Sequence, residues 1–89
     1  MSQINRISSG EAIICPETDI AGGEVQKFRG EILELINEKL QKVTVDFSKV
    51  EIIDSSGIGV FISAQNTLKK QNGILKVVNV SPDILKMFK

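Results

Sequence analysis

Histidine, tryptophan and tyrosine are absent from this 89-residue chain, and cysteine occurs only once. Without histidine the chain lacks the usual general base and the commonest metal ligand, and a single cysteine forms no internal disulfide. We therefore expect no metal site, no cofactor and no catalytic nucleophile–base pair. Cys15 lies in an apolar run, so we expect a buried small hydrophobic side chain rather than a reactive thiol.

An excess of charge of either sign is also missing. Eleven basic residues balance eleven acidic ones, which leaves no basic surface for a nucleic acid or an anionic membrane. The four aromatic residues are all phenylalanine, so a platform for stacking bases is not expected. The start, Met1–Arg6, lacks the pattern of a signal peptide, and no apolar run approaches membrane-spanning length. We expect one cytoplasmic domain over residues 1–89.

The spacing of apolar residues predicts strands that alternate with helices. Strands are expected at residues 4–7, 12–15, 43–47, 50–53 and 74–80, and helices at 24–40, from near 58 to 70, and at 82–88. Ser81 and Pro82 are typical of a cap and a first helical residue. This order predicts an α/β fold with a mostly parallel sheet of four to five strands, which begins with an antiparallel hairpin and carries helices packed on it.

One short stretch joins the strand-like run before residue 54 to the second helix: Asp54-Ser55-Ser56-Gly57-Ile58-Gly59. Its carboxylate and hydroxyls suit a helix start, where they accept hydrogen bonds from unpaired backbone N–H groups. Ser55 and Ser56 therefore have two open roles, as caps or as phosphorylation sites. Gly57 and Gly59 leave room for another molecule's backbone. A lone Gly-x-Gly is weak evidence for a nucleotide.

Three segments, taken in order, resemble the STAS domain of the anti-sigma-factor-antagonist type. Residues 43–50 are similar to the family's apolar strand that ends in Asp-(Leu/Phe)-Ser-x-Val. Residues 53–60 are similar to its Asp-Ser-(Ser/Thr/Ala)-Gly-(Leu/Ile)-Gly signature, and residues 69–80 to its second helix end and next strand. The resemblance extends from Ile4 to Phe88.

The resemblance implies a binding module rather than an enzyme. In this family a serine kinase, which is also the anti-sigma factor, phosphorylates the first hydroxyl after the aspartate, and that position is Ser55 here. The unphosphorylated form binds the kinase and releases the sigma factor, and a PP2C-type phosphatase restores it. The residues implied to contact the partner are Asp19, Asp54, Ser56, Gly57, Ile58 and Gly59.

Other interpretations remain open. The chain could be an unphosphorylated STAS scaffold subunit of a lipid-transport or sensory complex, and an enzyme is a third alternative. Lys69 and Lys70 could form a solvated helix end or a docking patch.

The end of the chain departs from the family, which usually continues after the third helix into another strand and a last helix. Two helical turns cannot bury all of the apolar side chains near this end, which are Ile84, Leu85, Met87 and Phe88. We expect at least one of them to be exposed. We also expect this form to be less stable than a longer chain, or to self-associate through its C-terminal helix.

Overall fold

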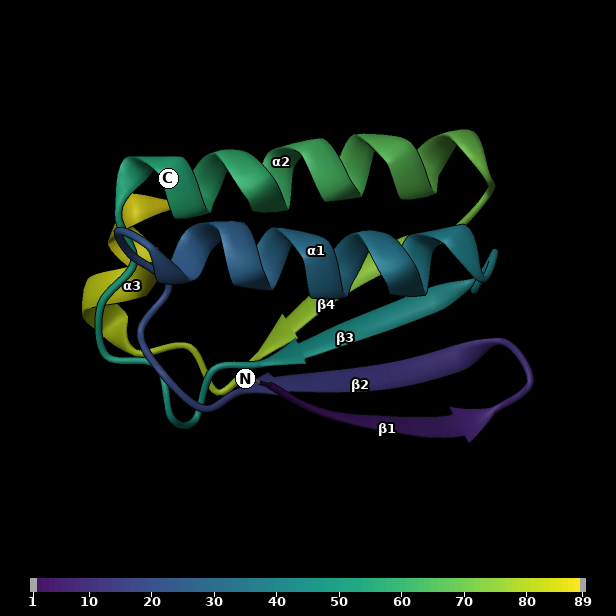
Figure 1. Ribbon diagram of the computed structural model, residues 1–89, viewed down its shortest axis with the longest axis horizontal. Helices are drawn as coiled ribbons and strands as arrows, with labels where there is room; N and C mark the ends of the chain where they lie inside the picture. Colours follow the sequence, from purple (N-terminus) through teal and green to yellow (C-terminus); the bar gives the residue numbers. More distant parts are fainter. Residues whose placement is uncertain (1, 89) are drawn as a thin grey trace.

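The computed structural model describes residues 2–88, which form a four-stranded sheet and three helices (Figure 1). The elements are β1 (Ser2–Ser8), β2 (Glu11–Pro16), α1 (Glu24–Asn37), β3 (Lys42–Asp46), α2 (Ser55–Lys70), β4 (Ile74–Val78) and α3 (Pro82–Met87). The strand order is β1-β2-β3-β4, with β1 antiparallel to β2 and the other neighbours parallel. The predicted fold class is confirmed, with four strands in the sheet.

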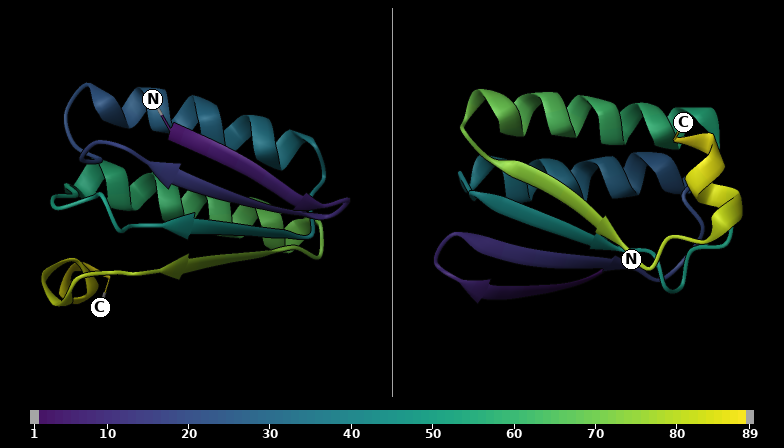
Figure 2. Two further views of the ribbon diagram at one scale, coloured as in Figure 1. Left: turned by 90° about the horizontal axis from the view of Figure 1, so that it is seen from below. Right: turned by 180° about the vertical axis from the view of Figure 1, so that it is seen from behind.

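Helices α1 and α2 lie side by side on one face of the sheet, and neither helix covers the opposite face (Figures 1 and 2). Alternate strand residues point toward the helices and are fully buried, among them Ile14, Val43 and Val45. Helix α1 contributes an apolar stripe at helical spacing, which consists of Val25, Phe28, Ile32, Leu35 and Ile36. The core therefore lies in a single layer between sheet and helices.

Cys15 is only partly buried, so the prediction of a fully buried side chain was wrong. The residues on either side of it in β2, Ile14 and Pro16, are buried, so by strand alternation Cys15 faces the uncovered side of the sheet. A sequence pattern cannot tell which face of a sheet the helices will cover.

Several elements differ from the predicted ones, and helix α2 begins at Ser55 rather than near residue 58. Residues 50–53 form no strand, and only Ile53 makes an isolated bridge, to Ile20. Strand β4 ends at Val78 because Asn79 adopts a left-handed conformation with φ of 57°. Helix α1 ends at Asn37, because Lys39 adopts a left-handed conformation with φ of 60°. Leu40, the last residue of the predicted helix, therefore lies beyond the helix end.

Helix α3 lies beyond the C-terminal end of β4 (Figure 2). Ser81 caps it by accepting a hydrogen bond from the N–H of Ile84, and Pro82 is its first residue, as predicted. Ile84 is buried, whereas Leu85 and Met87 are 45% and 46% exposed, which confirms that at least one apolar side chain of this segment is exposed. Reduced stability and self-association through this helix stay predictions.

Both ends of the described chain lie at the same end of the molecule. Ser2 pairs with Pro16, the last residue of β2. Phe88 packs its ring against Phe47, just after β3, and against Phe61 of α2, with ring centroids 6.2 and 5.8 Å apart. This is the end at which the parallel strands finish and α2 begins (Figure 1).

None of the helices formed by residues 2–88 is both long and apolar enough to cross a lipid bilayer.

Candidate functional site

The segments that follow β2 and β3 meet at the start of α2, at the C-terminal edge of the parallel strands. Such edges are where open α/β sheets usually bind other molecules. The predicted site residues come from the first of these segments, around Asp19, and from the turn between Asp54 and Gly59.

Asp54 caps helix α2. Its Oδ1 accepts hydrogen bonds from the Ser56 hydroxyl at 2.6 Å and from the Gly57 N–H at 2.9 Å, and its Oδ2 accepts one from the Gly22 N–H at 3.0 Å. These bonds, above all the one from Ser56, lower the pKa of Asp54 to about 2. The carboxylate is therefore ionised at neutral pH. The cap is this aspartate, so the alternative in which Ser55 or Ser56 caps the helix was wrong.

Asp19 holds the other loop in place. Its Oδ1 accepts hydrogen bonds from the backbone N–H groups of Glu51 and Ile52, at 2.9 and 3.1 Å. The backbone of Ile20 completes the connection. Its N–H donates a hydrogen bond to the carbonyl oxygen of Ile52, and its carbonyl oxygen accepts one from the N–H of Asp54. The two predicted acidic residues therefore lie at one edge, and both fasten the loop after β2 to the segment before α2.

Gly57 is buried against the first loop rather than open to another molecule. A Cβ atom at this position would lie 2.6 Å from the carbonyl oxygen of Ile20 and 2.8 Å from Cγ1 of Ile53. The structure thus requires glycine here for internal packing, and the sequence interpretation of Gly57 was wrong. At Gly59 a Cβ would meet nothing within 4 Å, so the helix surface there is open. Ile58 is partly buried and packs against the core.

The two serines differ in what their hydroxyls do. Ser56 is exposed but donates its hydroxyl to Asp54. Ser55, the first residue of α2, is exposed, and no hydrogen bond between residues 2 and 88 uses its hydroxyl. The first turn of a helix favours added negative charge. The Ser55 hydroxyl is therefore available to a reactant from solution.

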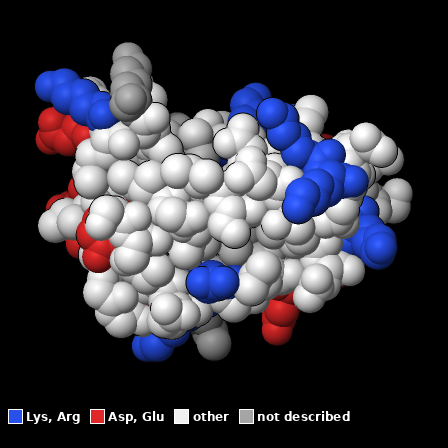
Figure 3. Space-filling view, turned by 90° about the horizontal axis from the view of Figure 1, so that it is seen from above, with Lys and Arg blue, Asp and Glu red and all other residues white. Residues whose placement is uncertain are grey.

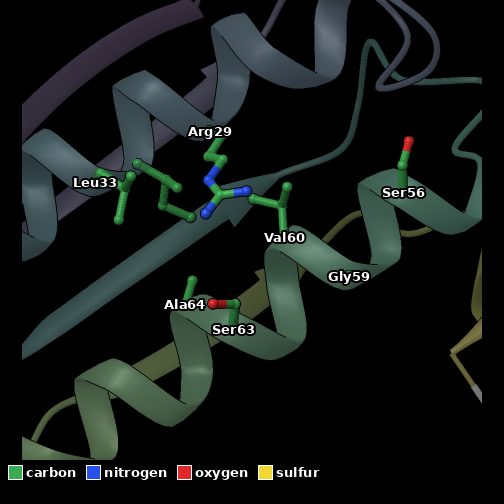
Figure 4. A pocket seen from close by; sticks show the side chains of 8 residues that line it. Arg29, Leu33, Ser56, Gly59, Val60, Ser63 and Ala64 are labelled. Atoms are coloured by element: carbon green, nitrogen blue, oxygen red, sulfur yellow. The ribbon is translucent and has the colours of Figure 1, made fainter.

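A groove between α1 and α2 begins beside this turn, and the sequence did not reveal it. Its volume is about 210 Å³, and its lining residues are Arg29, Ile32, Leu33, Ser56, Gly59, Val60, Ser63 and Ala64. Figure 4 shows the Arg29 side chain reaching from α1 across the groove toward Val60. The groove exists because the two helices pack side by side, which a sequence pattern does not show. The one feature of the sequence that could have pointed to it is the absence of charged residues between Ser55 and Leu68.

The outer face of the helix layer is mostly uncharged in its middle, and basic side chains gather over the end where α2 finishes (Figure 3). Lys69 and Lys70 belong to that last turn. They lie at the opposite end of α2 from Ser55, so the structure does not bring them to the candidate site. Among residues 2–88, no group of three histidine, cysteine or acidic side chains is arranged to hold a metal ion.

The comparisons with known proteins agree with this fold. The sequence profile of the STAS domain matches residues 3–89. The structure superimposes on the anti-sigma factor antagonist SpoIIAA in its unphosphorylated form with a TM-score of 0.83 and 21% identity, covering 99% of this chain and 81% of that one. A putative anti-sigma factor antagonist from Thermotoga maritima gives a TM-score of 0.86 at 18% identity, covering 97% of this chain and 76% of that one.

Two further structures broaden the comparison. The phosphorylated form of Bacillus SpoIIAA gives a TM-score of 0.79 at 23% identity, covering 99% and 80% of the two chains. The murine anion transporter Slc26a9 gives a TM-score of 0.76 at 17% identity, covering 89% of this chain and 13% of the transporter. No curated protein matches the sequence.

Proposed function

The chain belongs to the STAS domain family, and from this premise we propose that it is an anti-sigma-factor antagonist controlled by phosphorylation. Unphosphorylated, it binds a serine kinase that is also the anti-sigma factor, and so releases the sigma factor. Phosphorylation of Ser55 by that kinase ends the interaction, and a PP2C-type phosphatase restores it. The chain is the substrate of these enzymes and has no catalytic role of its own.

The observation that carries the proposal is the exposed Ser55 hydroxyl at the first position of α2. It follows directly after the ionised Asp54 carboxylate, and it is not occupied by a hydrogen bond within residues 2–88. The neighbouring Ser56 hydroxyl donates to Asp54 and is thereby held. This difference supports Ser55 as the phosphate acceptor.

The physical effect of the phosphate follows from its charge. A phosphoserine carries about −1.5 to −2 charges at neutral pH. The start of a helix tolerates this charge, so the fold is retained. Beside the ionised Asp54, however, the phosphate repels an acidic partner surface and resists removal from water when an interface closes over it. A loss of about 3 kcal/mol of binding free energy weakens affinity more than a hundredfold.

The proposed partner surface is the edge formed by the loop of Asp19 and the first turn of α2. Ser56, Ile58 and Gly59 contribute surface or support for it, and Gly59 is open to an approaching backbone. Gly57 contributes indirectly, because its missing side chain lets the loop of Ile20 pack against the helix. The comparison with SpoIIAA, whose structures include an unphosphorylated and a phosphorylated form, supports this type of switch.

The test uses the purified chain, ATP, and a serine kinase of the anti-sigma type, which is to be sought among the genes next to its own. We expect one added phosphate by intact-mass spectrometry, located on Ser55 by peptide mapping. The Ser56→Ala variant should still be phosphorylated, and Ser55→Ala should not. A kinase that binds the chain tightly but transfers no phosphate to it would contradict the proposal and favour the scaffold function.

A further inference from the structure

We propose that the groove between α1 and α2, crossed by Arg29, receives an acidic side chain of the same partner that binds unphosphorylated Ser55. This inference rests on the proposed function, because it assigns a contact to the partner defined there. It extends the partner surface from the first turn of α2 along the helix pair, to a residue that no sequence motif indicated.

The geometry of the groove favours an inserted side chain. Its floor is apolar, since Ile32 and Ala64 are buried beneath it, and its volume is about 210 Å³. Arg29 is exposed, and its side chain reaches over this floor toward Val60 (Figure 4). A carboxylate entering the groove would thus meet a planar donor that forms two parallel hydrogen bonds.

Among residues 2–88, Arg29 forms no ion pair. The positions three and four residues away on α1 are Val25, Gln26, Ile32 and Leu33. On the facing helix no residue between Ser55 and Leu68 is charged, and the ion pairs among residues 2–88 involve other cations. A carboxylate that pairs with Arg29 would therefore come from another molecule.

One apolar side chain at the groove and one on the outer side of α2 are exposed. Leu33 of α1 is 41% exposed, and Ile62 on the outer side of α2 is 55% exposed. An arginine among uncharged and apolar groups is the typical composition of the centre of a protein interface. A single cation is too little for a nucleic acid or an anionic membrane, which bind through clusters of basic residues. The complementary molecule is thus a protein surface with one acidic side chain among apolar ones.

The groove is close enough to Ser55 for the phosphate to act on it. Figure 4 shows Arg29 over Val60, five residues after Ser55, which is about 7.5 Å along the helix axis. Along the helix axis this rise is within the screening length of about 8 Å at physiological salt. A phosphate on Ser55 would attract the Arg29 guanidinium and repel the partner's carboxylate. A phosphate on Ser55 would therefore interact with two charges of the chain, the Asp54 carboxylate and the Arg29 guanidinium.

The experiment measures binding of the unphosphorylated chain to the kinase identified by the phosphorylation assay, by calorimetry. We expect Arg29→Glu to weaken binding by about tenfold or more, because it replaces an attraction by a repulsion. The matched control is Lys76→Glu, the same charge change on the uncovered face of the sheet, which should stay within about twofold of wild type. Substitution of one acidic residue of the kinase by lysine should restore binding to Arg29→Glu.

The outcomes separate this inference from the function it rests on. Wild-type binding and phosphorylation with an unaffected Arg29→Glu variant would overturn the inference and leave the proposed function intact. If Arg29→Glu loses binding and no acidic-to-lysine substitution of the kinase restores it, the proposal that Arg29 contacts a carboxylate of the kinase is wrong. Sedimentation in which the wild-type chain alone is a dimer and Arg29→Glu is a monomer would instead assign the groove to a second copy. If wild type neither binds nor is phosphorylated, both proposals fail.

Discussion

Asp54 accepts a hydrogen bond at 3.0 Å from the backbone N–H of Gly22, a residue 32 positions earlier in the chain. The same carboxylate caps α2 through the Gly57 N–H. One side chain thus fixes the loop of Asp19 to the helix start that carries Ser55. The position of the candidate surface depends on this connection.

The glycines of the first turn of α2 should respond oppositely to the same substitution. Gly57→Ala should lower the free energy of unfolding by about 1–3 kcal/mol, because the added Cβ clashes with the backbone oxygen of Ile20. Gly59→Ala should raise it by about 0.5–1 kcal/mol, because the site is open and alanine favours a helix. Urea unfolding measures both. Equal effects would contradict the packing described for Gly57.

The charge of Asp54 should make its stabilising contribution depend on pH. The folded-state pKa is about 2, below the ordinary value of 3.8, so the contribution is present above about pH 4 and is lost as the pH falls toward 2. Asp54→Asn retains an acceptor oxygen but not the charge. We expect the difference in unfolding free energy between wild type and this variant to be largest at neutral pH and to shrink below pH 4. Denaturant titrations over this range test it, and a constant difference would be inconsistent with the lowered pKa.

Ser55→Ala should abolish phosphorylation and leave the fold and the kinase complex intact, because the hydroxyl is exposed and makes no hydrogen bond within residues 2–88. Mass spectrometry and calorimetry measure the two effects. The control is Ser56→Ala, which loses the hydrogen bond to Asp54 but keeps the acceptor. If mass spectrometry located the phosphate on Ser56 alone, the assignment of Ser55 as the phosphate acceptor would be wrong.

Ser55→Asp should weaken binding to the kinase by about tenfold or more, which corresponds to about 1.4 kcal/mol. Added negative charge at a helix start is compatible with folding but not with an acidic or apolar interface. The circular dichroism spectrum should match that of wild type. In the Arg29→Glu background we expect a smaller effect of Ser55→Asp. Equal calorimetric affinities for Ser55→Asp and wild type would rule out a switch based on charge.

Asp19→Ala should weaken engagement by the kinase, and it should also cost some stability without unfolding the domain. The substitution removes the oxygen that accepts hydrogen bonds from the N–H groups of Glu51 and Ile52, so we expect the free energy of unfolding to fall by about 1–2 kcal/mol. Asp19→Asn keeps an acceptor oxygen and removes the charge, so it separates loop support from charge recognition. Phosphorylation kinetics and thermal unfolding measure the two effects. Wild-type kinetics in both variants would exclude Asp19 from the partner surface.

Local patterns in the sequence were enough to predict the order of strands and helices, apart from the strand expected at residues 50–53, and the Ser81 cap, because those depend on residues close together in the chain. The sequence left Asp54, Ser55 and Ser56 as alternative caps, and the hydrogen bond that Asp54 accepts from the distant Gly22 was not predictable from local pattern. The reason for Gly57 lies in its contact with Ile20, and the orientation of Arg29 depends on how α1 and α2 pack. Both are consequences of contacts between distant segments.

The location of Ser2 and Phe88, the first and last residues that the structure describes, affects how this domain can be labelled. Ser2 lies beside Pro16 and Phe88 beside Phe47, so a tag, dye or surface anchor at either end would sit next to the edge that we propose as the partner surface. Immobilised or fused forms would then report weakened association for a trivial steric reason. The turn between β1 and β2, at Ser9 and Gly10, lies at the opposite end of the molecule (Figure 1). A single cysteine introduced at Ser9 in a Cys15→Ser background would carry a fluorophore there and leave that edge accessible.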